Sequence, residues 1–354
     1  NDLLAAPNHP ELETEKVYQP RIRAEDLLRE GTGQDTGDFR EVVGQENAKR
    51  GAEIAAAGFH NLLMIGPPGV GKSMVAGRIP GILPPLTLKE SLEVTGIFSV
   101  AGLLPPGQAL ITRRPFYAPH HTVTQAALIG GGSGIPRPGM VSLAHRGVLF
   151  LDELPEFRKN VLDGMRQPME ERKVQIARSA GMVTYPSDFI LVAAMNPCPC
   201  GYYPDRNKCR CTQPQIEKYL GKISGPILDR IDLCVELHPV DILHLQKTKT
   251  EKSSEDMKRQ IRHARERQAE RFAGTDCRFN GDIRSAQVEE YCPLGEEGQK
   301  VMEQLYRTLQ LSARVYHRIL KTARTIADLE DREEITGEHL LEAACYRPSE
   351  TYWN

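Results

Sequence analysis

Short runs of apolar residues alternate with helical patterns from Phe39 to about Pro239. The clearest runs are Asn61–Ile65, Val148–Leu151 and Phe189–Ala194, which are apolar over nearly their whole length. Strands that are buried on both faces have this pattern, and their alternation with helices is typical of a parallel sheet covered by helices. We therefore predict an α/β core.

After Pro239 the strand patterns stop and helical periodicity takes over. We predict helices over Lys252–Phe272, Gly298–Ala327 and Thr336–Cys345. Residues 1–39 are polar and broken by Pro and Gly, which favours a tail or linker. The pattern divides the chain into this tail (1–39), the α/β core (40–239) and an all-helical domain (240–354).

A glycine-rich segment follows the first apolar run and opens a helix. It consists of Gly66, Pro67, Pro68, Gly69, Val70, Gly71, Lys72 and Ser73. This fits G-x-x-x-x-G-K-[ST], and the strand before it and the helix after it are the context that the motif requires. Backbone N–H groups of such a loop bind phosphates, while Lys72 would reach the β- and γ-phosphates and Ser73 would ligate Mg²⁺. We predict ATP and Mg²⁺ binding over the alternative, a chance glycine-rich turn.

Two carboxylates, Asp152 and Glu153, end the run Val148–Leu151. Asp152 would lie near Mg²⁺, and Glu153 would lie where it can polarise an attacking water. Alone, an acidic pair at a strand end is weak evidence, but this one follows the phosphate loop by about eighty residues. The Asp–Glu order favours a hydrolysing motor over a nucleotide kinase.

Isolated polar residues supply further candidates. Asn196 ends the third run and could orient the same water; the alternative is a turn formed with Pro197. Arg230 could offset charge that develops on a γ-phosphate, although an isolated arginine is more often a salt-bridge residue. His120 and His121 could bind a metal, but we favour simple packing within their loop.

Four of the eight cysteines fall within fourteen residues: Cys198, Cys200, Cys209 and Cys211. The segment between the two pairs is turn-rich and too short to form a core. Two thiolate pairs joined in this way suit a tetrahedral Zn²⁺ with no open position, which would be structural. An iron–sulfur cluster, free thiols and a disulfide are the alternatives, and the C-x-C spacing is less usual for zinc than C-x-x-C.

The composition is that of an ordinary globular protein. Of 354 residues, 40% are hydrophobic and 26% charged, and the net charge is -2. A nucleic-acid contact would therefore have to come from local basic clusters. We expect a cytoplasmic protein, because no apolar run approaches a membrane span and the other cysteines are scattered. The first residue is Asn1 rather than Met, so we expect a fragment or a processed chain.

Several segments together resemble the magnesium-chelatase-like AAA+ ATPases of the ComM/YifB type. They are Ala56–Gly69, Ala118–Thr122, Ile129–Gly132, Leu151–Leu154 and Met195–Cys198. The resemblance runs from roughly Gly44 to Arg347 and implies an AAA+ fold with a helical lid. Such proteins usually carry an N-terminal domain with a Lon-protease-like fold, which we expect this chain to lack.

The resemblance also implies roles. Lys72 and Ser73 match Walker A, Asp152 and Glu153 match Walker B, Asn196 matches sensor 1, Arg230 matches the arginine finger, Arg314 matches sensor 2, and Gly44 and Gln45 match adenine contacts. A finger that acts on the adjacent subunit requires a homo-oligomer, and rings of this class are commonly hexamers.

The family branch carries two inserts, which we place at Val100–Arg114, within the helix after the second strand, and at Arg172–Tyr185, as a hairpin before sensor 1. The second segment has a strand pattern on both sides of a turn. In related helicases such hairpins grip DNA, so Lys173 and Arg178 are candidate phosphate contacts. Solvated surface charge is the alternative.

Three functions remain open. The leading hypothesis is a DNA helicase or branch-migration motor that acts in natural transformation or recombination, as the resemblance implies. The second is a chelatase-type motor that drives metal insertion by a partner enzyme. The cysteine cluster is not expected in those motor subunits, which favours DNA. The third, a scaffold that binds ATP without turnover, is disfavoured because Glu153, Asn196 and Arg230 are all present.

Overall fold

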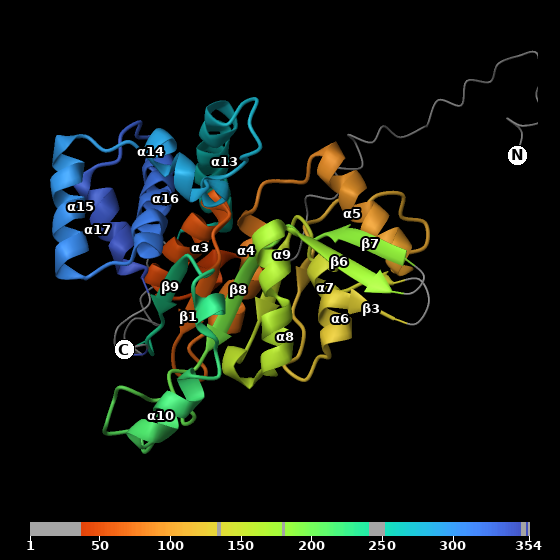
Figure 1. Ribbon diagram of the computed structural model, residues 1–354, viewed down its shortest axis with the longest axis horizontal. Coiled ribbons are helices and arrows are strands. Elements are labelled where there is room, and N and C mark those ends of the chain that lie inside the picture. The colour runs from red at the N-terminus through yellow and green to blue at the C-terminus, as the bar shows by residue number, and fades with distance from the viewer. Residues whose placement is uncertain (1–36, 133–135, 179–180, 241–251, 348–351, 353–354) are drawn as a thin grey trace, which may run out of the picture.

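The computed structural model of the chain describes residues 37–132, 136–178, 181–240, 252–347 and 352 (Figure 1). Residues 1–36 of the predicted tail lie outside this part. The first described element is the 3₁₀ helix η3 (Phe39–Glu41), which Asp38 caps. Asp38 also accepts a hydrogen bond from the backbone of Ser254, so this end of the chain is tied to the C-terminal helical part.

The predicted parallel sheet is confirmed and has five strands, in the order β2-β5-β8-β1-β9. Their bounds are Leu62–Ile65 (β1), Phe116–Tyr117 (β2), Val148–Leu151 (β5), Ile190–Met195 (β8) and Leu233–Glu236 (β9). All neighbours are parallel, so the carboxyl ends of β5, β8 and β1 lie side by side at one edge. The sequence predicted β1, β5 and β8, but it did not reveal the short strands β2 and β9.

Helices cover both faces of the sheet. Successive side chains along a strand point to opposite faces, so each buried strand contributes to a hydrophobic cluster on either side. Leu62 and Met64 of β1 pack in one hydrophobic cluster, and Leu63 and Ile65 pack in the other. The first cluster holds α3 (Glu46–Gly58), α4 (Lys72–Ile82) and the C-terminal helices. The second face is covered by α6 (Gln125–Ile129), α7 (Met140–Leu143), η4 (Leu154–Glu156), α8 (Lys159–Gly164), α9 (Arg166–Glu171), α10 (Gln213–Leu220) and α11 (Gly225–Leu228).

The C-terminal part is helical and packs beside α3, as Figure 1 shows. It comprises α13 (Ser254–Arg271), η5 (Asn280–Asp282), η6 (Ser285–Gln287), α14 (Val288–Tyr291), α15 (Glu296–Thr308), α16 (Ala313–Leu329) and α17 (Gly337–Cys345). The single helix predicted over Gly298–Ala327 is wrong. The chain turns at Gln310, whose φ is 45°, and Ser312 accepts a hydrogen bond from Val315 N–H and so begins a second helix.

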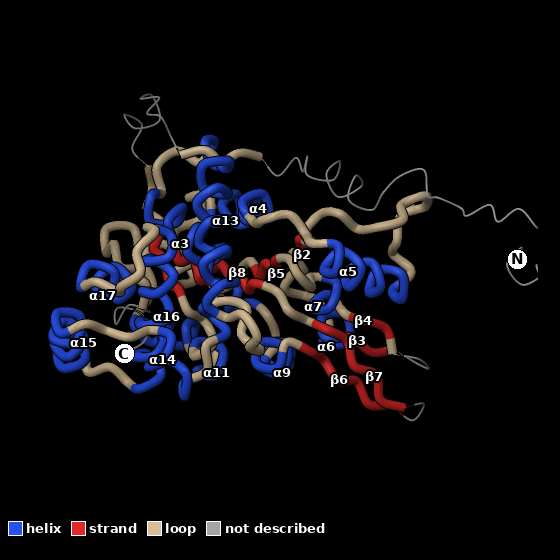
Figure 2. Tube along the Cα trace, turned by 90° about the horizontal axis from the view of Figure 1, so that it is seen from above, coloured by secondary structure: helices blue, strands red, loops and turns tan. Residues whose placement is uncertain are grey.

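Two small hairpins lie together at one end of the molecule (Figure 2). One is the predicted hairpin, with antiparallel strands β6 (Lys173–Arg178) and β7 (Gly181–Pro186). The other is formed by β3 (Gly130–Gly131) and β4 (Arg137–Pro138). The Tyr185 hydroxyl joins them by donating to Pro136 O at 2.6 Å.

The second hairpin corrects the placement of an insert at Val100–Arg114. That segment contains the end of α5 (Leu88–Ala101) and a loop, and it precedes β2. The segment that interrupts the helices after β2 is instead the hairpin β3–β4, which lies between α6 and α7. The prediction was wrong because β2 is only 2 residues long and half-buried, so its apolar signal is weak.

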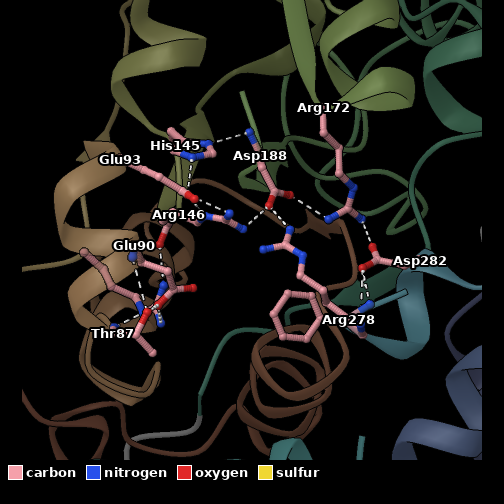
Figure 3. Close-up of polar contacts among 11 residues, drawn as sticks. Thr87, Glu90, Glu93, His145, Arg146, Arg172, Asp188, Arg278 and Asp282 are labelled. Carbon is pink, nitrogen blue, oxygen red and sulfur yellow. Dashed lines mark hydrogen bonds and ion pairs between the residues drawn. The ribbon is translucent and has the colours of Figure 1, made fainter. Parts of the chain in front are cut away.

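A buried carboxylate, Asp188, joins the hairpin base to the rest of the molecule (Figure 3). It lies between β7 and β8 and pairs with Arg146 and Arg172, each at 2.6 Å, and with Arg278. Arg172 precedes β6 and also pairs with Asp282 of η5. One network therefore connects the hairpin, the sheet and the C-terminal helices.

Candidate nucleotide and metal sites

The segment Gly66–Ser73 connects β1 to α4 at the carboxyl edge of the sheet. Gly69 and Gly71 have φ values of +81° and +95°, which glycine adopts without strain. A Cβ at either position would meet no atom within 4 Å, so the space beside both glycines is open. Backbone N–H groups at the start of α4 lie beside this space, as a phosphate group requires.

Lys72 and Asn196 are brought together although they are far apart in the sequence. Lys72 Nζ donates to Asn196 Oδ1 at 3.0 Å and to the carbonyls of Gly66 and Pro67 at 2.6 and 2.8 Å. Burial lowers the pKa of Lys72 from its ordinary value, and the carboxylates of Asp152 and Glu153 oppose that shift. The ammonium group is thus held at the loop by neutral oxygens that an anion could replace.

Ser73 and Asp152 form the second pair at this edge. Ser73 Oγ donates to Asp152 Oδ2 at 2.9 Å. Hard oxygen donors of this kind suit Mg²⁺, which is usually bound through one or two protein oxygens, waters and phosphates. The two side chains therefore fit the metal that the phosphate loop implies.

Glu153 lies next to Asp152 in a left-handed conformation, with φ of 53°. Its carboxylate Oε2 is 3.2 Å from Nδ1 of His121. The ring of His121 lies against that of His120, tilted by 34°, with centroids 4.0 Å apart. The sequence analysis predicted only packing within the loop and missed the contact between His121 and Glu153. The one available signal was that the His-His dipeptide follows an apolar segment, whose end lies at the same sheet edge.

Gln45 lies between the phosphate loop and the segment after β9. Its Nε2 donates to Val70 O at 3.3 Å and to His238 O at 2.7 Å. Gly44 precedes it with φ of +66°, and a Cβ there would lie 3.4 Å from the side chain of Val240. Both residues are therefore close to the phosphate loop, where they were predicted to contact adenine.

Arg230 and Arg314 lie at the opposite edge of the sheet from Lys72. Asn61, which precedes β1, donates to Arg230 O at 2.8 Å, whereas the phosphate loop follows β1. The Arg230 guanidinium pairs with Glu170, and Arg314 pairs with Asp229. The structure does not bring either arginine to the phosphate loop of its own chain.

The hairpin places Lys173 at the start of β6, where its ammonium lies 4.0 Å from Glu171 and is about half exposed. Arg178 ends β6, but its side chain lies outside the described part. Met182 is the second residue of β7 and is the most exposed large apolar side chain of the described residues.

The four clustered cysteines converge on one point, with all four Sγ atoms within 4.8 Å of one another. Sγ of Cys198 lies 3.3 Å from that of Cys200 and 3.8 Å from that of Cys209. Four sulfurs held about 2.3 Å from a tetrahedral Zn²⁺ would be about 3.8 Å apart. Within the described residues no other set of three or more His, Cys, Asp or Glu side chains converges in this way.

The thiols of this cluster differ in acidity. Burial opposes the charged form of Cys200, but hydrogen bonds from the Tyr202 backbone and from Cys198 outweigh it and lower its pKa to about 6. Burial and the neighbouring thiols raise the pKa of Cys209, and that of Cys211 to about 12. Without a cation, one thiolate therefore suppresses ionisation of the others. The donor set fits a soft divalent metal, which would stabilise all four thiolates.

Every helix in the described part of the chain is too short or too polar to cross a membrane.

Comparison with known proteins gives matches along most of the chain. The family described as magnesium chelatase, subunit ChlI, matches residues 38–245, and the C-terminal part of the same subunit matches residues 251–347. The uncharacterized protein YifB of Salmonella typhimurium is 46% identical over 314 residues, which is 88% of this chain and 60% of that protein. Competence protein ComM of Haemophilus influenzae is 43% identical over 322 residues, or 89% of this chain and 61% of that protein.

A more distant match is the magnesium-chelatase 67 kDa subunit of Chlorobaculum parvum, which is 24% identical over 283 residues. That alignment covers 74% of this chain and 38% of the subunit. The chain thus spans about 60% of the length of the YifB and ComM proteins that it matches.

Proposed function

Because this chain belongs to the magnesium chelatase ChlI family of AAA+ proteins, we propose that it hydrolyses ATP with Mg²⁺ in a homo-oligomeric ring, a hexamer, and acts on DNA. The observation that carries the proposal is the set of polar contacts at one edge of three neighbouring strands. Lys72 contacts Asn196, and Ser73 contacts Asp152, with Glu153 beside them. Ligands of open α/β sheets bind at this edge.

ATP bound with Mg²⁺ supplies the phosphoanhydride bond that is broken. Lys72 exchanges its carbonyl and amide partners for phosphate oxygens, and Ser73 and Asp152 offer oxygens to the metal. Glu153 accepts a proton from the attacking water, and Asn196 orients that water. Each role requires only the side-chain positions described above.

The ring is proposed because neither candidate arginine, Arg230 or Arg314, lies at the phosphate loop of its own chain. Arg230 and Arg314 lie at the far edge of the sheet, from which they could reach the phosphates of a neighbouring subunit. An arginine supplied in trans stabilises charge in the transition state. This geometry supports a site completed at the interface between two copies.

DNA is proposed as the partner because of the similarity to ComM, which is named a competence protein. The exposed Lys173 on the protruding hairpin is a suitable phosphate contact. The match to a magnesium-chelatase subunit, at lower identity, favours metal insertion as the alternative. We further propose that Zn²⁺ is the metal of the cysteine cluster.

The test is ATP hydrolysis by the full chain with Mg²⁺, measured without DNA and with single-stranded, duplex and branched DNA. We expect hydrolysis that DNA stimulates and that Lys72→Ala abolishes. Absence of hydrolysis in verified rings would refute the ATPase assignment. Hydrolysis that no form of DNA changes would refute the DNA assignment alone and favour the chelatase-type motor.

A further inference from the structure

The loop that carries the cysteine cluster packs directly on the phosphate loop. Gly201 lies between the two cysteine pairs and has φ of +87°. A Cβ at this position would lie 2.6 Å from Cδ of Pro68, the third residue of the phosphate loop. Real Cβ atoms do not approach so closely, so only glycine allows the backbone of the cysteine loop to pack this tightly on the Pro68 ring.

The same loop adjoins the residue that contacts Lys72. Cys198 follows Asn196 by two residues, and Cys198 is fully buried. On the other side, α10 begins two residues after Cys211 and carries the buried Tyr219, whose side chain lies beside the backbone of Asn196. Asn196 is therefore held between the start of the cysteine loop and the helix that follows it.

Apart from its four cysteines, the loop packs on the second hydrophobic cluster mainly through Tyr203, whose ring also contacts that of Tyr352. From Cys198 to Cys211 the buried residues are Cys198, Gly201 and Cys209, and the remainder is half-buried or exposed. By contrast, α10 is anchored in the second hydrophobic cluster by Ile216 and Leu220. Figure 1 shows the loop and α10 extending away from the body of the molecule. Two of the three buried residues of the loop are thus members of the cysteine cluster, so a metal that holds the cysteines would also hold the loop.

We infer that Zn²⁺ at Cys198, Cys200, Cys209 and Cys211 is a requirement for tight nucleotide binding, because it fixes Gly201 against Pro68 and Asn196 beside Lys72. The inference rests on the proposed ATP site and assigns the metal a role in that site. Loss of the metal frees the loop, and the phosphate loop then loses the backbone packed on it. The sheet and the C-terminal helices have their own hydrophobic clusters and stay folded.

Coupling between two binding sites is reciprocal, and coupling factors are typically about 5–150-fold. Zinc should raise the affinity for Mg²⁺–nucleotide, and nucleotide should raise the affinity for zinc by the same factor. If the metal only stabilised a remote part of the surface, zinc would not change the affinity for nucleotide, and nucleotide would not change the affinity for zinc.

The experiment measures binding of a fluorescent ATP analogue to the full chain at constant free Mg²⁺. Protein with about one zinc per chain is compared with protein treated with a zinc-selective chelator and with the same protein after zinc is restored. We expect stripping to weaken nucleotide binding about tenfold and restored zinc to recover it. In parallel, competition with a chromophoric chelator should show that the nucleotide tightens zinc binding by an equal factor.

Two pairs of variants separate the contact from general damage. Cys209→Ser should lose zinc and nucleotide affinity, whereas Cys277→Ser, a buried thiol outside the cluster, should retain both. Gly201→Ala should keep zinc but weaken nucleotide binding. Its control is Gly274→Ala, since Gly274 has a similar φ of +78° but no atom within 4 Å of its Cβ position.

Stripped protein that keeps its helical circular dichroism and binds nucleotide as tightly as loaded protein would overturn the inference. So would zinc content near zero in protein that binds nucleotide tightly. Neither result depends on turnover, so an inactive ATPase would refute the proposed function without deciding this inference.

Discussion

Asp188→Asn should destabilise the protein, because it removes the one negative charge that three arginines share. The side chain of Asp188 is 4% exposed, and both of its oxygens form ion pairs. Asparagine has nearly the same shape, so the substitution changes the charge without opening a cavity. It tests whether the network in Figure 3 is held together by that charge.

The cost follows from what each arginine keeps. Arg146 retains Glu93 at 2.7 Å, and Arg172 retains Asp282, so neither is left unpaired. Arg278 loses the carboxylate of Asp188, but it is 38% exposed and can turn to water. Removing one partner of a fully buried pair costs about 3–5 kcal/mol, and the partial exposure here reduces this to about 2–3 kcal/mol.

Thermal unfolding followed by circular dichroism measures this cost. For a chain of 354 residues about 2–3 kcal/mol corresponds to a fall in Tm of about 3–4 °C. The control is Glu303→Gln, because Glu303 and Arg307 are 3.8 Å apart and 71% and 82% exposed, and such a pair contributes little. If Asp188→Asn lowers Tm no more than Glu303→Gln does, the network is not stabilised by the Asp188 charge.

Three further predictions concern the proposed motor. Glu153→Gln should bind nucleotide but release no phosphate, whereas Lys72→Ala should weaken binding itself; wild-type hydrolysis by Glu153→Gln would contradict the assignment of the general base. Arg230→Ala and Lys72→Ala subunits, each inactive alone, should recover part of the hydrolysis when mixed in the same rings, and mixed rings that stay inactive would argue against a role in trans. Lys173→Ala should weaken DNA binding and reduce the slope of log affinity against log salt by about 1; a loss no larger than that of Lys300→Ala, on the exposed face of α15, would show that Lys173 carries ordinary surface charge.

The sequence predicted those parts of the fold whose signal is local and strong. Strands β1, β5 and β8 are completely buried, so each is a continuous apolar run. By contrast, β2 has 2 half-buried residues, and its pairing with β5 depends on the rest of the sheet. The break between α15 and α16 was missed for a related reason. Gln310 has a positive φ, although glutamine gives no signal for that conformation.

Candidate site residues were found where a motif names them, but their contacts come from the order of the strands. Lys72 meets Asn196 across 124 positions because β1 and β8 are neighbours. Ser73 meets Asp152 across 79 positions because α4 begins at the edge of the sheet where β5 ends. The contact of His121 with Glu153 needs β2 to lie next to β5, and the contact of Gly201 with Pro68 needs the cysteine loop to fold back. Neither arrangement has a local pattern that predicts it.

The location of Arg230 bears on how subunits would assemble. Strand β1 has 4 residues, so its first and last Cα atoms are about 10 Å apart, and Arg230 and the phosphate loop lie beyond opposite ends of it, too far apart for the arginine to reach the loop of its own chain. Burial lowers the pKa of Arg230, and the nearby charges of Arg166 and Arg314 lower it further. Within the single chain, Glu170 pairs with Arg230, and Asp229 pairs with Arg314. A neighbouring triphosphate would have to compete with those carboxylates, so nucleotide-dependent assembly would exchange ion pairs within one chain for ion pairs between two.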